Sequence, residues 1–260
     1  MSSLRVTLVQ QPLEWHDPAA NRARFEELLL PLAGRTDLAV LPETFTTGFS
    51  MDVERIAEPA AGATTEWLKR LAVALDAAVT GSVVTLEAGR CYNRLLWTAP
   101  GAELRQYDKR HLFRMGREHQ HFTPGVEAWT VAWRGFRICP LVCYDLRFPV
   151  FSRRRAALDY DLLLYVANWP AARAAAWRAL LPARAIENQA YVVGVNRVGA
   201  DGRGVPYAGD SAAFDFLGKP LAEAGGGSAL LTVELAAEAL AAFRESFPAH
   251  LDADRFTLEP

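Results

Sequence analysis

The chain has 260 residues, 51% of them apolar, and a formal net charge of −2 at pH 7. This length and apolar content suit one domain with a sizeable core, expected to span residues 1–260 because no linker-like change of composition divides it. The small charge gives no reason to expect nucleic acid or an anionic membrane as a partner, and the odd count of three cysteines argues against a disulfide framework.

Apolar runs stay well short of the roughly 20 residues that a membrane span needs, so no membrane association is expected. The first residues also lack the charged start and long apolar stretch of a signal peptide. We therefore expect a cytoplasmic protein whose cysteines are reduced.

Hydrophobic periodicity predicts strands and helices mixed along the first half of the chain. Residues 4–10 alternate in the manner of a strand, and residues 18–30 place apolar side chains at helical spacing before Pro31. The further expected elements are a strand at 38–41, a helix at 64–78, strands at 79–86, 91–98 and 104–107, and a hairpin of 129–133 and 136–142 joined at Arg134-Gly135.

The second half continues in the same style and ends in an irregular tail from about residue 247. Its expected strands are 161–167, 191–198, 211–216, 220–223 and 230–235, and its expected helices are 172–188 and 236–243. Mixed strands and helices with several hairpins predict stacked sheets covered by helices.

Three reactive side chains lie at the ends of predicted strands. Cys143 ends the apolar run 138–142, Glu43 ends the run 37–41 after a Pro, and Lys109 follows the strand at 104–107. Residues at strand ends can converge at one edge of a sheet. A thiol, a carboxylate and an ammonium at one point would supply a nucleophile, a general base and an oxyanion partner.

This trio suits attack on a carbonyl without a metal or an organic cofactor. A thiol is nucleophilic only as the thiolate, so Glu43 would take the proton of Cys143, and a helix beginning near Pro149 would also favour the thiolate. The tetrahedral oxyanion would be stabilised by the Lys109 ammonium and the backbone N–H of Tyr144. An amine would leave with the proton, and water would hydrolyse the thioester.

Each member also has an ordinary structural explanation. Cysteines flanked by apolar residues are usually small core residues, which is our interpretation of Cys91 and Cys139. Glu43 and Lys109 taken singly suit a solvated turn and a solvated strand end. However, only three of the 28 basic residues are Lys, so a Lys that remains suggests a position where the broad guanidinium of Arg does not serve.

A metal site is not expected. His111, His119 and His121 offer only a weak His-x-His pattern, and the spacing of Cys139 and Cys143 is not the Cys-x-x-Cys of zinc sites.

Three blocks of the sequence resemble the nitrilase, or carbon–nitrogen hydrolase, superfamily. They are Pro42-Glu43, then Lys109-Arg110-His111-Leu112-Phe113, then Cys143-Tyr144-Asp145-Leu146-Arg147-Phe148-Pro149, with support from Ala167-Asn168-Trp169-Pro170 and from the run 184–189. The resemblance implies an α/β fold built as a four-layer α-β-β-α sandwich, a catalytic triad of Glu43, Lys109 and Cys143, and a homodimer. It also implies a second glutamate between the Lys and the Cys, a position that Glu118 fits.

Within this superfamily the segments around Phe113 and Glu118 resemble bacterial omega-amidases, which hydrolyse the terminal amide of 2-oxo acids such as 2-oxoglutaramate. Such a small-molecule substrate carries a carboxylate, so an Arg is expected in the pocket. Arg147 and Arg173 are the candidates, although a structural ion pair is the alternative for each. Trp169 and Phe122 are candidate pocket walls, with core packing as the alternative.

Two other functions stay open at this point. The same triad serves hydrolases of nitriles, N-carbamoyl groups and simple amides. A non-catalytic dimeric binding module on the same fold is the third possibility, although loss of a triad residue would be its mark and none is lost.

Overall fold

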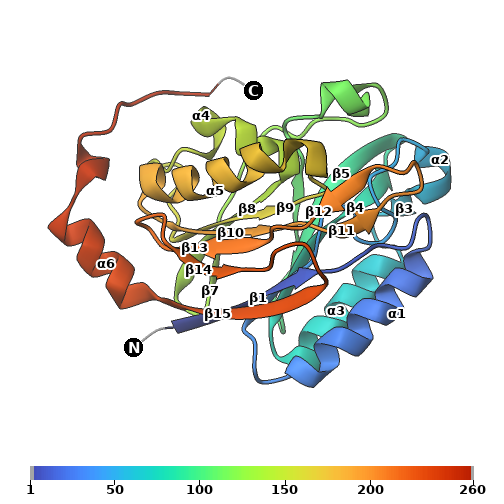
Figure 1. Ribbon diagram of the computed structural model, residues 1–260, viewed down its shortest axis with the longest axis horizontal. Helices are drawn as coiled ribbons and strands as arrows, with labels where there is room; N and C mark the ends of the chain where they lie inside the picture. The colour runs from blue at the N-terminus through green and yellow to red at the C-terminus, as the bar shows by residue number, and fades with distance from the viewer. Residues whose placement is uncertain (1–2, 259–260) are drawn as a thin grey trace.

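The computed structural model describes residues 3–258 and contains two β-sheets that lie face to face with helices on their outer sides (Figure 1). The order of layers is helix, sheet, sheet, helix, as the sequence predicted. Within the described residues, no helix combines the length and apolar character that crossing a membrane requires.

The first sheet has seven strands in the described part of the chain. In spatial order they are β15 (Ala229–Ala236), β1 (Ser3–Gln10), β2 (Leu38–Val40), β4 (Ala78–Glu87), β5 (Arg90–Thr98) and β6 (Arg105–Asp108), with the short β3 (Glu58–Pro59) paired to β4. The hairpin between β4 and β5 turns at Ala88 and Gly89, which both have positive φ, as tight hairpin turns require.

The second sheet has six strands among residues 3–258. Their order is β14 (Pro220–Glu223), β13 (Ala212–Phe214), β10 (Tyr191–Val195), β9 (Leu162–Val166), β8 (Phe136–Val142) and β7 (Val131–Trp133). The turn between β7 and β8 lies at Arg134 and Gly135, again with positive φ at both, which confirms the predicted hairpin. A separate two-stranded ribbon pairs β11 (Val198–Ala200) with β12 (Pro206–Ala208).

The helices are placed by their caps and apolar sides. They are α1 (Pro18–Leu29), α2 (Val53–Ile56), α3 (Ala63–Leu75), α4 (Pro149–Ser152), α5 (Ala174–Asn188) and α6 (Ala237–Ser246). The side chain of Asp17 caps α1 by accepting from the N–H of Ala20, and α3 ends at Asp76 in the left-handed conformation. The last helix lies at the left edge of Figure 1, and the tail that follows it rises there and then runs across the top of the picture.

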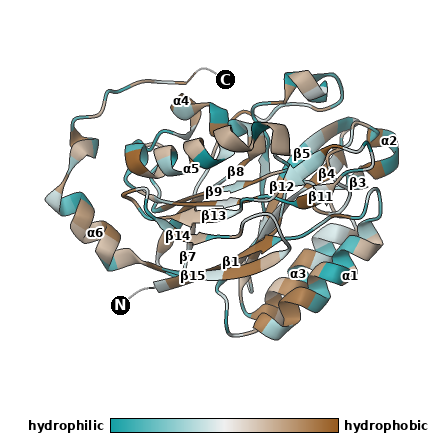
Figure 2. Cartoon of the chain, viewed as in Figure 1, coloured by the Kyte–Doolittle hydropathy of each residue, from teal (hydrophilic) through white to brown (hydrophobic). Residues whose placement is uncertain are grey.

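Two apolar interfaces hold the layers together. On β1, Leu4, Val6 and Leu8 join the core between the two sheets, whereas Val9 joins the core between the first sheet and the pair α1 and α3. This alternation follows from the two-residue period of a strand, and Figure 2 shows hydrophobic residues along β1 and both kinds of residue on the covering helices. On the other side, Trp177 and Leu181 of α5 pack onto the second sheet.

Strand direction brings the predicted reactive residues to one place. The strands β2 and β4 are parallel, and β6 is antiparallel to β5, which is itself antiparallel to β4. Therefore β2 and β6 run the same way and end at the same edge of the first sheet. In the second sheet, β8, β9 and β10 are parallel to one another and likewise end together.

Some boundaries differ from the prediction. The predicted strand 191–198 is divided into β10 and β11 by Asn196 and Arg197. The side chain of Asn196 binds both the N–H and the C=O of Trp169, at 2.8 and 3.0 Å, which draws the chain away from the strand. The short elements α2, β3 and β12 were not predicted, and the tail, as far as residue 258, contains one 3₁₀ turn at Ala249–Leu251.

Candidate active site

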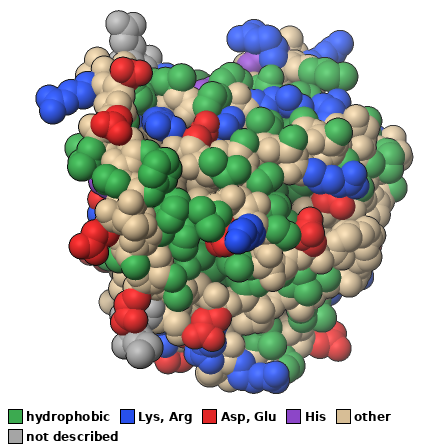
Figure 3. Space-filling view, turned by 60° about the vertical axis from the view of Figure 1, so that its left-hand side comes forward, with side chains coloured by type: hydrophobic (Ala, Val, Ile, Leu, Met, Phe, Trp, Pro, Cys, Tyr) green, Lys and Arg blue, Asp and Glu red, His purple; other side chains and the backbone are tan. Residues whose placement is uncertain are grey.

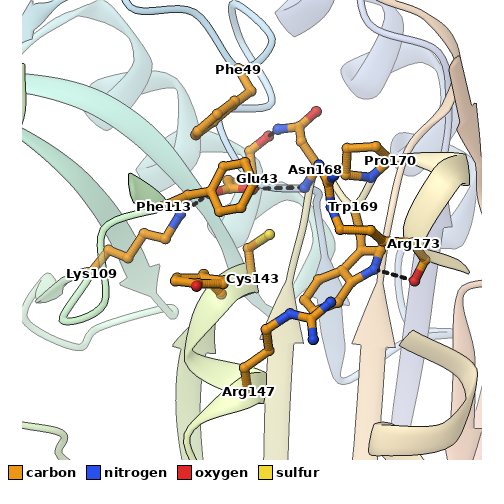
Figure 4. Close-up of a pocket in the computed structure, with 11 residues that line it drawn as sticks. Glu43, Phe49, Lys109, Phe113, Cys143, Arg147, Asn168, Trp169, Pro170 and Arg173 are labelled. Atoms are coloured by element: carbon orange, nitrogen blue, oxygen red, sulfur yellow. Dashed lines mark hydrogen bonds and ion pairs between the residues drawn. The ribbon is translucent and has the colours of Figure 1, made fainter. Parts of the chain in front are cut away.

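Glu43, Lys109 and Cys143 converge between the two sheets (Figure 4). Glu43 lies three residues after β2, Lys109 follows β6 directly, and Cys143 follows β8 as the first residue of the 3₁₀ helix η4 (Cys143–Arg147). Glu43 and Lys109 therefore come from the first sheet and Cys143 comes from the second. Convergence of these three side chains was predicted from their positions at strand ends.

The three side chains form a buried network with Glu118. The Lys109 ammonium donates to Glu43 Oε1 at 2.8 Å and to both carboxylate oxygens of Glu118 at 2.9 and 3.0 Å. The residues Glu43 and Glu118 are completely buried, and Lys109 is 1% exposed. Two carboxylates and one ammonium thus share a site from which water is excluded, so their interactions are strong and their pairing is obligatory.

The pKa values in this network shift in opposite senses. Burial opposes the charged ammonium, but the negative charges of Glu118 and Glu43 outweigh it and raise the pKa of Lys109 above its usual range. Burial also raises the pKa of Glu118, against the attraction of Lys109. Lys109 is therefore a permanent cation at neutral pH.

The thiol of Cys143 is held in its protonated form. Burial and then the negative charge of Glu43 raise the pKa of Cys143 well above its usual value, while the charge of Lys109 lowers it. The prediction that a helix near Pro149 favours the thiolate is wrong: α4 has four residues and begins six residues after the sulfur. Proton transfer to Glu43 must therefore accompany any attack by this sulfur.

The bend at Cys143 is strained and firmly held. Its φ of +44° lies in the left-handed region, which costs a non-glycine residue about 1–2 kcal/mol. The buried carboxylate of Asp145 holds the bend by accepting from the N–H of Val142 at 3.0 Å, the hydroxyl of Tyr107 at 2.7 Å and the N–H of His111 at 3.0 Å. Asp145 thus ties the turn of the nucleophile to the segment that follows Lys109.

Two asparagines complete the network around Glu43, and sequence reasoning assigned a role to neither. The backbone N–H of Asn168 donates to Glu43 Oε2 at 2.7 Å. The side-chain amide of Asn93 donates to Glu43 Oε1 at 2.8 Å and to Glu118 Oε1 at 3.0 Å. The signal available for Asn93 was an amide in the middle of a predicted strand, two residues before the apolar run 95–97.

The network opens into a pocket of about 390 Å³, which includes its open mouth. The predicted residues Tyr144, Arg147, Trp169 and Arg173 line it, and the further lining residues are Phe49, Phe113, Asn168 and Pro170. Tyr144 is the second residue of η4, where backbone N–H groups have no partner within the helix. Oxyanion stabilisation from this N–H is geometrically available.

The two arginines lie over aromatic rings. The guanidinium of Arg147 is 4.9 Å from the ring centre of Trp169, and that of Arg173 is 5.0 Å from the ring centre of Phe113. Among residues 3–258, neither Arg147 nor Arg173 forms an ion pair with a carboxylate. Both are thus available to an anionic group that enters the pocket.

Phe122 lies elsewhere. Its side chain is 6% exposed and packs with Ile56 and Val84 in a small apolar cluster. The backbone N–H of Phe122 donates to the C=O of Glu118, and this turn directs the side chain to that cluster and not into the pocket. The aromatic wall expected from Phe122 is provided instead by Phe49 and Phe113.

Comparison with known proteins agrees with this geometry. The family model described as carbon-nitrogen hydrolase matches residues 5–245. The chain is 52% identical to the omega-amidase YafV of Yersinia enterocolitica, over 99% of this chain and 100% of that protein. It is 30% identical to the 2-oxoglutaramate amidase of Bacillus subtilis, over 94% and 95% of the two chains.

Among solved structures, the fold matches XC1258 from Xanthomonas campestris with a TM-score of 0.97 and 52% identity, and the match covers 100% of both chains. That protein is described as a CN-hydrolase superfamily member with an arsenic adduct in its active site. The layered architecture, the buried Glu43–Lys109–Cys143 network and a family match along nearly the whole chain lead to one conclusion: this chain belongs to the carbon–nitrogen hydrolase family.

Proposed function

We propose that this protein is an omega-amidase, which hydrolyses the terminal amide of a 2-oxo dicarboxylic acid monoamide to the acid and ammonia. The observation that carries the proposal is a buried thiol, carboxylate and ammonium at the base of a pocket flanked by two arginines that pair with no carboxylate within the described residues. Similarity to proteins named omega-amidase and 2-oxoglutaramate amidase supports the same substrate class.

In the first half of the reaction, Cys143 Sγ attacks the amide carbon as its proton moves to Glu43. The carbonyl oxygen becomes an oxyanion, which the Lys109 ammonium and the Tyr144 N–H stabilise. Each such donor typically contributes about 2.7–4 kcal/mol to transition-state stabilisation. The carbon–nitrogen bond then breaks, Glu43 returns the proton to the nitrogen, and ammonia leaves a thioester on Cys143.

In the second half, water attacks the thioester carbon and gives one proton to Glu43. The carbon–sulfur bond breaks, the acid is released, and the sulfur regains its proton from Glu43. Glu118 keeps the ammonium of Lys109 in place through bonds from both of its oxygens, and no cofactor is needed in either half.

The far end of the substrate carries a carboxylate next to the 2-oxo group. We assign this carboxylate to Arg147, with Arg173 as the second candidate, because both guanidinium groups line the pocket over aromatic rings. A charge-assisted hydrogen bond to one of them contributes about 1.5–3 kcal/mol. The ring of Trp169, which is 3% exposed, supports Arg147 from below and serves as a pocket wall.

The test is ammonia release from a panel of compounds. The panel contains 2-oxoglutaramate, the neutral amide of matched length, an N-carbamoyl amino acid and a nitrile. Turnover of 2-oxoglutaramate at least ten times faster than of the neutral amide supports the proposal. Preference for the carbamoyl compound or the nitrile would assign another carbon–nitrogen hydrolase activity, and no turnover of any compound would favour a binding module.

We also propose a homodimer that acts in the cytoplasm. Large apolar side chains are exposed on the helices and tail of the second half, namely Ile186, Phe247 and Leu251 at 56, 59 and 75%. Figure 3 shows hydrophobic side chains gathered on the side of the molecule that carries α6 and the tail. Analytical ultracentrifugation at micromolar protein concentration tests the dimer.

The cytoplasmic location is supported by the cysteines. All three are free thiols, which a reducing compartment maintains.

A further inference from the structure

The side chain of Asn93 occupies an unusual position in the centre of the charged network. It lies on β5, is 1% exposed, and its amide N–H groups reach one oxygen of Glu43 and one oxygen of Glu118. Its backbone C=O also accepts from the backbone N–H of Lys109 at 2.9 Å. One residue therefore contacts all three charged members of the network.

The hydrogen-bond count at Glu43 shows what this contact does. A carboxylate has about four acceptor positions. On Glu43, Oε1 accepts from Asn93 and Lys109, and Oε2 accepts from the N–H of Asn168. This count leaves one position, on Oε2, open to the thiol of Cys143, which lines the same pocket as Glu43. Rotation of the carboxylate would break the two bonds at Oε1.

The orientation of the amide comes at a cost. The oxygen of the Asn93 side chain is buried and has no hydrogen-bond partner among the described residues. An unsatisfied buried carbonyl destabilises the fold, and an apolar residue of the same size would avoid this penalty. The reverse orientation would direct this oxygen at two carboxylates. The amide of Asn93 therefore serves through its N–H groups, while its oxygen stays buried without a hydrogen bond from the described residues.

We propose that Asn93 is a positioning residue of the hydrolysis: its amide directs the open acceptor position of Glu43 toward Cys143 and holds both carboxylates in place around Lys109. The inference rests on the proposed function only in assigning the proton acceptor to Glu43. The groups that face this carboxylate are Lys109, Glu118 and Cys143. The phenol of Tyr207 is more distant: burial raises its pKa, and the charge of Glu43 adds a smaller contribution.

Asn93→Leu removes the donors and keeps the volume. A carboxylate that loses a donor holds its proton to a higher pH. The acid limb of kcat/KM should move upward by about one to two pH units, and kcat/KM at pH 7 should fall at least ten-fold. Asn93→Asp places a third negative charge beside the two glutamates and should shift the limb further. Asn93→Ser, which is too short to reach both carboxylates, serves if the larger variants do not fold.

Asn188→Leu is the matched control. Asn188 is also a buried asparagine, 3% exposed, and its side chain binds the C=O of Arg184 and the N–H of Arg154 on the far side of the second sheet. This variant should lower the melting temperature but leave the acid limb where the wild-type protein has it. Loss of packing and loss of positioning are thereby separated.

A second readout needs no substrate, so it stands even if the assigned amide is not hydrolysed. The rate at which iodoacetamide modifies Cys143 should show the same upward shift with pH in Asn93→Leu. If folded Asn93 variants keep the wild-type pH dependence of both kcat/KM and alkylation, Asn93 is a packing residue and the inference fails. If the shift occurs while 2-oxoglutaramate is not turned over, only the substrate assignment fails.

Discussion

Replacing Lys109 with Met tests the centre of the network. The substitution keeps a similar stem but removes an ammonium that lies 2.8–3.0 Å from oxygens of Glu43 and Glu118. Removing one partner of a buried ion pair costs about 3–5 kcal/mol of stability, since the other charges stay buried without compensation. Loss of an oxyanion donor costs about 2.7–4 kcal/mol of transition-state stabilisation, a factor of about 10² to 10³ in kcat.

The loss of stability should depend on pH. Because the folded-state pKa of Lys109 is raised above its unfolded value, its contribution is fully present below about pH 10 and is lost only as pH rises further. In Lys109→Met, the carboxylates lose their cation, so burial raises the pKa of Glu118 without the opposing charge of Lys109 and favours its neutral form. The difference in unfolding free energy between the wild-type protein and this variant should therefore shrink as pH falls from 7 to 4.

Denaturant unfolding at several pH values measures the loss of stability in Lys109→Met, and ammonia release measures its loss of kcat. Lys109→Arg is the companion variant: it retains the positive charge, but its planar guanidinium does not fit where a compact ammonium meets three carboxylate oxygens. It should lose nearly as much activity as Lys109→Met. Near-normal turnover by Lys109→Arg would refute the assignment of Lys109 to the oxyanion and leave it a structural role.

The remaining predictions concern the thiol, the pocket and the two ion pairs of Asp161. Cys143→Ala should abolish turnover, while Cys91→Ala and Cys139→Ala should keep most of it. Peptide mass mapping should find that an electrophile modifies Cys143 first. Labelling of Cys91 instead would contradict the assignment of Cys143 as nucleophile. Arg147→Ala should raise KM strongly, lower kcat less and reduce kcat/KM at least ten-fold. This variant should also lose the preference for acidic over neutral amides. If both Arg147→Ala and Arg173→Ala keep that preference, another residue binds the substrate carboxylate. Burial tends to raise the pKa of Asp161, but hydrogen bonds from Arg137 and the charge of Arg244 on α6 outweigh it and lower this pKa. Asp161→Asn should therefore lower the melting temperature at neutral pH. The difference in melting temperature should disappear in acid, where the wild-type carboxyl is protonated.

Much of the fold followed from local patterns because its long elements have strong periodicity. The helix α3 buries Trp67, Leu68 and Leu71 at helical spacing, and β1 buries alternate residues on each of its faces. Short elements were missed because two to four residues carry no period. The division between β10 and β11 depends on the contact of Asn196 with Trp169, which lies 27 residues away in sequence.

The site was predictable as far as strand ends decide it. Glu43, Lys109 and Cys143 were expected together because residues at strand ends can converge at one edge of a sheet. The structure brings them together, but Cys143 comes from the second sheet and the other two from the first. Asn93 was not identified, because a strand pattern gives the face of a side chain but not the carboxylates that it will meet. The expected influence of a helix on the thiol failed because Pro149 begins only a single turn.

The protonated state of Cys143 becomes intelligible when the charge of the network is followed through the proposed first step. At rest, two carboxylates, one ammonium and a neutral thiol carry a net charge of −1 in a buried site. A thiolate formed before the attack would make the net charge of the network −2, and burial and the negative charge of Glu43 both oppose that thiolate. When the proton moves to Glu43 as sulfur attacks, Glu43 becomes neutral and the new oxyanion forms beside Lys109, so the net charge stays at −1. A carboxylate base coupled to a fixed cation thus lets a thiol with a raised pKa react without adding a second buried negative charge.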